Sequence, residues 1–331
     1  MALGRGRGTV LVLRALGLGD LLVAVPALRG LRAAYPADRL VLAAPAGLAP
    51  LAALTGAVDE LLPADGLSTP PVLTAVPEPP GLAVNLHGRG PDSTRALLRL
   101  RPGRLWAYAH PQLPAVDGPE WTDDEPEAAR WCRLLAAYGV PADPVDLDLP
   151  APPVPSPAPG AVLVHPGAAY GSRRWPADRY AAVAGALHRA GHRVVVTGGA
   201  AERPLATRVA AAAGLPADAV LAGRTGLLGL AALVEQARLV VCGDTGVGHL
   251  ATAYRTPSVL VFGPTPPAQW GPPAGRPEHR VLWHGTGRRD PFGPAPDPAV
   301  LAVQVPEVLA AVMTVLDRTA AGGTAGAATA P

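Results

Sequence analysis

Short runs of aliphatic and β-branched residues alternate with helix-like segments along most of this 331-residue chain. In the first half, residues 10–13, 39–44 and 82–86 are expected to be strands. A helix is expected from the Gly17 turn to about Tyr35. Such alternation is typical of parallel sheets covered by helices. The pattern therefore predicts the α/β fold class.

A segment dense in Pro and Asp, residues 141–159, interrupts the alternation and indicates an interdomain linker. After it the pattern restarts, with strands expected at 161–164, 192–197, 219–221, 239–241, 258–262 and 281–283 and a closing helix at 305–316. We therefore expect an N-terminal domain over residues 1–150 and a C-terminal domain over residues 151–318. Residues 319–331, rich in Ala, Gly and Thr, are expected to form a disordered tail.

Composition excludes several classes of protein. Only 16% of residues are charged and the net charge is +2, which gives no indication of a nucleic-acid partner. All 28 Lys and Arg residues are Arg, a bias typical of a GC-rich genome, so an Arg cluster alone means little. The two cysteines have no metal-ligand spacing and favour a reducing compartment. No run is long enough for a signal or a membrane span, so we expect a cytoplasmic protein without a transmembrane segment.

The first glycine-rich turn, Leu16-Gly17-Leu18-Gly19-Asp20, follows an expected strand and opens an expected helix. Backbone N–H groups at such a turn can face an anion. The turn lacks the third glycine of the dinucleotide fingerprint, which disfavours an NAD-dependent dehydrogenase. Asp20 fits two interpretations, a helix N-cap and a general base at a cleft edge, and both stay open.

Three further strand-to-helix turns lie in the second half. Arg173 and Arg174 follow the expected strand 161–164, where guanidinium groups suit phosphate oxygens, although a solvated surface pair is equally compatible. The turn at Glu202 carries an acid that could accept from ribose hydroxyls or complement a helix N-terminus. The run Gly243-Asp244-Thr245-Gly246-Val247-Gly248-His249 could hold a diphosphate, or contain an N-cap and a packed histidine. Parallel strands place all these turns at carboxyl ends, where open α/β sheets bind ligands, so a cleft between the domains is expected.

The segment from Gly223-Arg224-Thr225-Gly226 to Gly243-Asp244-Thr245-Gly246, followed by His249, resembles the donor-site signature of the bacterial heptosyltransferases of glycosyltransferase family nine. Phe262-Gly263-Pro264-Thr265 and Trp270-Gly271-Pro272 continue it. The N-terminal turn at Asp20 resembles the opening of that family, and Arg173-Arg174-Trp175-Pro176 its basic-Arg-Trp-Pro element. The resemblance spans nearly the whole chain in the same order.

This resemblance implies a GT-B fold, with two Rossmann-like domains facing a central cleft. It implies inverting transfer of a sugar from a nucleoside-diphosphate donor, an ADP-sugar such as ADP-heptose, with no metal or other cofactor required. Asp20 would be the catalytic base. The implied donor-binding residues are Arg173, Arg174, Glu202, Asp244, Thr245, Gly246 and His249.

The acceptor is open: a hydroxyl of a glycan, a lipid-linked sugar or a small molecule of secondary metabolism. His87 and Arg89, after the expected strand 82–86, are the best candidates for acceptor contacts. Weak peripheral membrane association also stays open.

Two departures from the family bear on the donor: Arg173 stands where Lys is usual, and Val247-Gly248 where Pro-Met is usual. A GT-B-fold nucleotide-sugar epimerase and a non-catalytic nucleotide-binding module are the alternatives.

Overall fold

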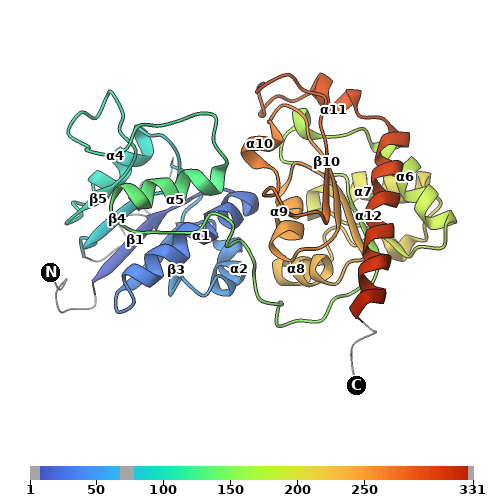
Figure 1. The fold of residues 1–331 in the computed structure, drawn as a ribbon, viewed down its shortest axis with the longest axis horizontal. Helices are drawn as coiled ribbons and strands as arrows, with labels where there is room; N and C mark the ends of the chain where they lie inside the picture. The colour runs from blue at the N-terminus through green and yellow to red at the C-terminus, as the bar shows by residue number, and fades with distance from the viewer. Residues whose placement is uncertain (1–7, 68–77, 327–331) are drawn as a thin grey trace. The chain divides into compact units, whose positions relative to one another are not determined.

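The computed structural model describes residues 8–67 and 78–326, with side chains described up to Arg318 (Figure 1). The chain divides into two compact units, Met1–Leu149 and Pro150–Pro331. Each unit holds one five-stranded sheet in which all pairings are parallel. The predicted α/β fold class is therefore confirmed.

The first sheet has the strand order β3-β2-β1-β4-β5. Its strands are β1 (Thr9–Leu13), β2 (Arg39–Ala44), β3 (Glu60–Pro63), β4 (Leu82–Asn85) and β5 (Leu105–Trp106). The central strand β1 reads Thr-Val-Leu-Val-Leu and is almost fully buried, as a parallel strand covered on both faces must be. This burial places whatever follows Leu13 at the carboxyl edge of the sheet.

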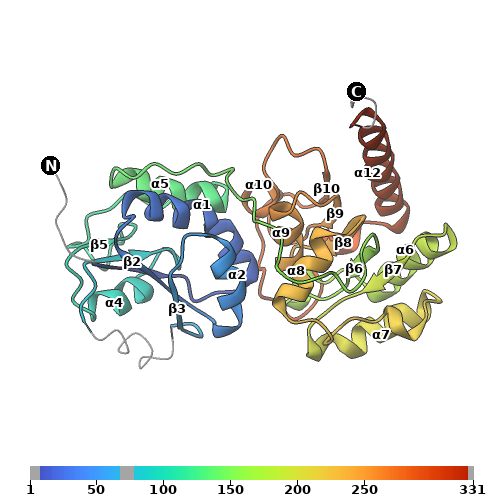
Figure 2. The same ribbon diagram turned by 90° about the horizontal axis from the view of Figure 1, so that it is seen from below.

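Helices cover both faces of this sheet. They are α1 (Leu18–Ala34), α2 (Ala49–Leu54), α4 (Asp92–Leu98) and α5 (Glu127–Ala137), with a 3-10 turn η1 (Ala46–Leu48). Figure 2 shows α1 and α5 together on one face of the sheet and α4 on the other. Because α1 packs closely against α5, residues on these two helices can meet at the carboxyl edge of β1.

The second sheet has the order β10-β9-β8-β6-β7. Its strands are β6 (Val162–His165), β7 (Val194–Val196), β8 (Leu239–Gly243), β9 (Ser258–Val261) and β10 (His279–Leu282). The helices are α6 (Ala177–Arg189), α7 (Arg203–Ala212), α8 (Leu227–Glu235), α9 (Gly246–Ala253), α10 (Pro267–Trp270), α11 (Pro298–Ala302) and α12 (Val305–Gly326), with 3-10 turns η2 (Gly171–Arg173), η3 (Ala200–Glu202) and η4 (Ala217–Ala219). Strands β6 to β9 pack with α6, α7 and α12 into one apolar core that includes Trp175 and Tyr180.

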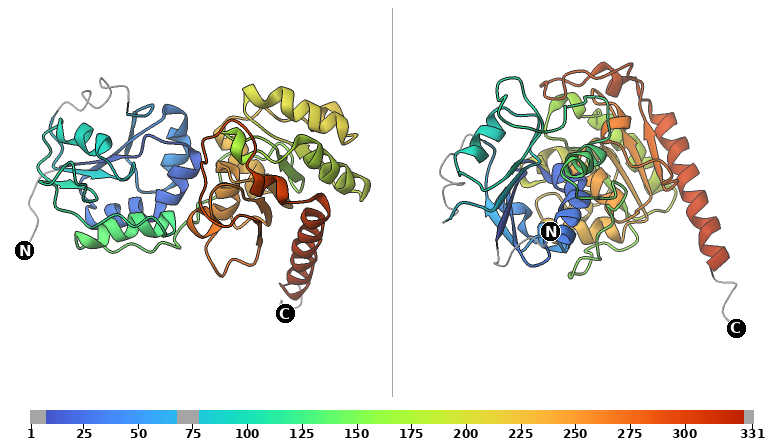
Figure 3. Two further views of the ribbon diagram at one scale, coloured as in Figure 1. Left: turned by 90° about the horizontal axis from the view of Figure 1, so that it is seen from above. Right: turned by 60° about the vertical axis from the view of Figure 1, so that its left-hand side comes forward.

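The structure departs from the sequence-based expectations at two places in this unit. The expected strand at 219–221 is instead the turn η4, followed by a single bridge between Val220 and Val196. The closing helix α12 continues to Gly326, past the expected start of a disordered tail at Thr319 (Figure 3). The first half of this helix is anchored by packing of Val308, Val312 and Val315 in the core, and a helix that is already formed can continue past its anchored part. Residues 327–331 of the expected tail lie outside the described residues.

Among residues 8–67 and 78–326, no helix is both long enough and apolar enough to cross a bilayer.

Candidate functional site

Asp20 lies in the first turn of α1, directly beyond the carboxyl end of β1. The helix begins at Leu18, and its N-cap is Gly17 in an extended conformation. Asp20 is therefore the third residue of the helix, and its interpretation as the N-cap is wrong. Its Oδ2 accepts a hydrogen bond from the N–H of Gly17 at 3.1 Å, so the carboxylate closes the cap from inside the first turn.

A buried arginine holds the other carboxylate oxygen of Asp20. The side chain of Arg14 is 1% exposed, and it donates to Oδ1 of Asp20 at 3.0 Å and to Oε1 of Glu127 at 3.3 Å. Its guanidinium also donates to the backbone carbonyls of Asp20 and Leu86 and lies 4.7 Å from the ring centre of Trp131. Both oxygens of Asp20 are thus fixed, while its side chain stays 25% exposed.

Sequence reasoning did not assign a role to Arg14. The signal was present, since a charged residue directly follows a buried strand in a glycine-rich turn. Its partner Glu127 comes from α5, far along the chain, and no local pattern connects the two.

His87 follows β4 and lies near Asp20. The pKa of His87 is lowered to about 4, chiefly by burial and also by the Arg14 guanidinium, while the Asp20 carboxylate partly opposes this shift. The imidazole is therefore neutral at neutral pH. The backbone N–H of His87 donates to Oδ1 of Asn85 at 3.0 Å, which fixes the turn after the strand. Arg89, the other candidate for acceptor binding, is exposed in the loop before α4.

The predicted donor residues of the C-terminal unit gather where β8 runs into α9. Asp244 follows the strand and is buried, and Thr245 is the N-cap of α9. His249 lies in the first turn of that helix. Gly246 is the first residue of α9, so its backbone N–H has no hydrogen-bond acceptor within the helix.

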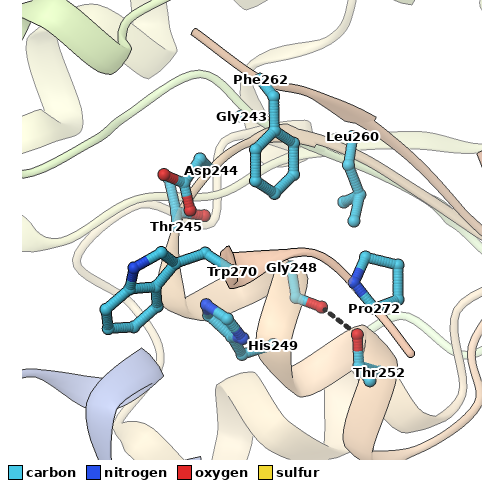
Figure 4. A pocket seen from close by; sticks show the side chains of 10 residues that line it. All are labelled: Gly243, Asp244, Thr245, Gly248, His249, Thr252, Leu260, Phe262, Trp270 and Pro272. Atoms are coloured by element: carbon cyan, nitrogen blue, oxygen red, sulfur yellow. Dashed lines mark hydrogen bonds between the residues drawn. The ribbon is translucent and has the colours of Figure 1, made fainter. Parts of the chain in front are cut away.

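A pocket opens at this place (Figure 4). It is a small hollow, partly open to solvent, lined by Gly243, Asp244, Thr245, Gly248, His249, Thr252, Leu260, Phe262, Trp270 and Pro272. Trp270 and His249 meet edge to face with ring centres 6.0 Å apart. Trp270 was part of the family resemblance but had no predicted role. The pocket combines an aromatic wall with a carboxylate and an imidazole.

The two predicted arginines have different surroundings. Nη1 of Arg173 lies 3.9 Å from Oδ2 of Asp244, and its Nε donates to the carbonyl of Pro291 at 3.3 Å. Arg174 instead donates twice to the carbonyl of Ala168, from Nε at 2.9 Å and from Nη2 at 2.8 Å. The structure thus brings Arg173 to the pocket residue Asp244, whereas Arg174 stabilises the loop between β6 and α6 that carries both arginines.

Glu202 has the same local geometry as Asp20. Its Oε2 accepts from the N–H of Gly199, the residue before η3, at 2.8 Å. His165, buried at the end of β6, is close enough for the Glu202 carboxylate to raise its pKa, although burial has the larger effect and lowers it. Unlike Asp20, Glu202 has no buried arginine on its second oxygen among the residues that the structure describes.

In the part of the chain that the structure describes, no three His, Cys, Asp or Glu side chains gather in a way that could hold a metal ion.

Comparison with known proteins shows what the chain is similar to. Residues 144–286 match the model of glycosyltransferase family 9 (heptosyltransferase). Lipooligosaccharide heptosyltransferase 2 of Haemophilus influenzae is 35% identical over 114 residues, covering 33% of this chain and 32% of that protein. Lipopolysaccharide heptosyltransferase 1 of Pseudomonas aeruginosa is 40% identical over 115 residues, covering 34% of this chain and 31% of that protein. The matched segments thus span under a third of these relatives' length.

Solved structures show the same fold over nearly the whole chain. The Escherichia coli ADP-heptose lipopolysaccharide heptosyltransferase II superposes with a TM-score of 0.75 at 20% identity, covering 94% of this chain and 99% of that one. An E. coli heptosyltransferase with bound ADP superposes with a TM-score of 0.68 at 18% identity, covering 92% and 99%. The two parallel sheets are therefore the Rossmann-like domains of a GT-B fold. Residues 144–286 also match the model of glycosyltransferase family 9, the heptosyltransferase family, so the predicted resemblance to that family is confirmed.

Proposed function

We propose that this protein transfers a heptose from ADP-heptose to a hydroxyl of a glycan, lipid-linked or small-molecule acceptor, with inversion at the anomeric carbon. The observation that carries the proposal is the Gly-Asp-Thr-Gly turn at the end of β8. There Asp244 and the guanidinium of Arg173 approach to 3.9 Å beside a pocket with an aromatic wall. Relatives of the same family have been solved with ADP and with ADP-2-deoxy-2-fluoro heptose.

The C-terminal unit would bind the donor. The first N–H groups of α9 and the guanidinium of Arg173 suit the diphosphate, which gains negative charge as the sugar leaves. Glu202 would accept hydrogen bonds from the ribose. Asp244, Thr245, Gly246 and His249 would shape the pocket around the sugar and the phosphates. Arg174 would keep the loop that carries Arg173 in place.

The N-terminal unit would bind the acceptor and supply the base. An inverting displacement needs one group that takes the proton of the attacking hydroxyl. Asp20 fits this task because its carboxylate is fixed by Arg14 and Gly17 yet remains partly exposed. The neutral imidazole of His87 lies near it and would contact the acceptor together with Arg89. No metal or other cofactor takes part in this scheme.

A nucleotide screen tests the proposal and separates it from its alternatives. A ligand that binds the native state alone raises the melting temperature, so ADP-, GDP-, UDP- and dTDP-sugars can be compared by thermal shift. We expect stabilisation by ADP and ADP-heptose. Release of ADP from ADP-heptose that depends on an added acceptor would distinguish a transferase from a non-catalytic nucleotide-binding module. Conversion of the donor sugar without ADP release would instead indicate an epimerase.

A further inference from the structure

The carboxylate of Glu202 lies in a space that exists because residue 167 has no side chain. Gly167 follows β6, and a Cβ atom placed on it would lie 2.0 Å from Oε1 and 2.6 Å from Oε2 of Glu202. On the neighbouring strand end, a Cβ on Gly198 would lie 3.2 Å from the same Oε2. The carboxylate is therefore held between two glycines that follow two adjacent strands.

The two oxygens of this carboxylate have different tasks. Oε2 accepts the N–H of Gly199 and so closes the start of η3. Oε1 accepts no hydrogen bond from any residue that the structure describes. Capping of η3 requires only one carboxylate oxygen and the local turn. It does not require a glycine at the end of the neighbouring strand. The missing side chain at Gly167 is thus not explained by capping.

We infer that Gly167 is a positioning residue for Glu202, and that this pair makes the site selective for ribose over 2′-deoxyribose. The inference rests on the proposed nucleotide function. A carboxylate with one oxygen fixed and the other open can accept from hydroxyls of a ribose, and hydrogen bonds to charged groups are the stronger ones. A site built to bond a hydroxyl rejects the analogue that lacks it.

The substitution Gly167→Ala isolates this arrangement. The new methyl group would collide with the end of the flexible Glu202 side chain, so we expect the carboxylate to swing away from Gly167 while the backbone stays in place. Gly167 does not have a positive φ, so alanine fits its backbone conformation. Gly287→Ala is a matched control in the same unit, because a Cβ there would have no neighbour within 4 Å.

The test is calorimetric titration of the intact chain with ADP and with 2′-deoxy-ADP. We expect the natural protein to bind ADP about tenfold or more tightly than 2′-deoxy-ADP. Gly167→Ala should lose most of that preference, weakening ADP binding more than 2′-deoxy-ADP binding, and it should melt within a few degrees of the natural protein. In a Glu202→Gln background, Gly167→Ala should change ADP binding less than about twofold, because it acts through Glu202.

Several outcomes would overturn the inference. These are unchanged ADP binding by Gly167→Ala, an equal loss for both nucleotides, and a full additional loss in the Glu202→Gln background. A natural protein that binds ADP without preferring ribose would end this inference and leave the proposed function standing. If UDP bound in place of ADP, the ADP-sugar proposal would fail, and UDP with 2′-deoxy-UDP would then test Gly167.

Discussion

Nη1 of Arg173 lies 3.9 Å from Oδ2 of Asp244, although the two residues follow different strands of the C-terminal sheet. The strands concerned, β6 and β8, are neighbours, so their carboxyl ends deliver both side chains to one place. Asp244 is 4% exposed at its side chain and Arg173 is 24% exposed. A cation held against a buried carboxylate, with part of its surface open, is suited to bind an incoming phosphate.

Replacing Arg173 by Ala should weaken ADP binding by about 10- to 100-fold, because a hydrogen bond to a charged group contributes about 1.5–3 kcal/mol. Arg174→Ala is the matched control. Its guanidinium is committed to the carbonyl of Ala168, so we expect it to lower the melting temperature more than the ADP affinity. Calorimetry and thermal melting of both variants check this. An ADP affinity left unchanged by Arg173→Ala would remove Arg173 from the donor site.

Asp20→Asn should reduce transfer from ADP-heptose by about 10²–10⁴-fold, because an amide cannot take the proton of an acceptor hydroxyl. Binding of ADP should not change. The amide has one oxygen where Asp20 uses two, so a contact to Arg14 or Gly17 is lost and the free energy of unfolding should fall by about 1–3 kcal/mol. Assays belong below the melting temperature of the variant. Near-normal transfer by Asp20→Asn would leave Asp20 as part of the helix cap and no more.

Arg14→Gln should lower the free energy of unfolding by about 1–3 kcal/mol, because Asp20 loses its buried cation and Glu127 keeps only its ion pair with Arg130. Arg39→Gln is a control in the same unit. That side chain forms an exposed ion pair with Glu60, the two side chains being 47% and 51% exposed, so we expect a loss of at most about 1 kcal/mol. Urea unfolding curves measure both. A loss for Arg14→Gln no larger than that of the control would mean that the buried network contributes little.

The stability of the protein should fall between pH 6.5 and pH 4. The pKa of His279 is lowered to about 4, chiefly by burial; Glu278 opposes this shift, while Arg276 and Arg255 contribute to it. Nδ1 of His279 lies 2.8 Å from Oγ of Ser258. Because its pKa is lower in the folded than in the unfolded chain, the unfolded chain takes up the proton first and unfolding is favoured as the pH falls. Urea unfolding at several pH values should show a steeper decline for the natural protein than for His279→Gln. Equal slopes would contradict this assignment.

Much of the fold was predictable because it depends on local pattern. Buried strands read as continuous aliphatic runs, and the glycine-rich turns mark where each strand meets a helix. The strand β5 was missed because it has two residues. So short a segment gives no periodic signal. The helix α5 was missed although its sequence is amphipathic, with Trp131, Leu134 and Leu135 on its buried face.

The candidate site, like the fold, was predictable only where it depends on local sequence pattern. Asp20, Glu202 and the turn at Asp244 could be selected because each lies in a local motif. The contacts that fix them could not, since Arg14 meets Glu127 and Gly167 meets Glu202 across the sheet. These pairings depend on strand order and helix packing, which a local pattern does not contain.

Calorimetric titration of the intact protein with ADP and UDP tests the account most directly, since the whole scheme depends on an ADP-linked donor bound by the C-terminal unit. We expect saturable ADP binding to one site, at least tenfold tighter than that of UDP, and strongly weakened by Arg173→Ala. Tight binding of UDP with none of ADP would contradict the account.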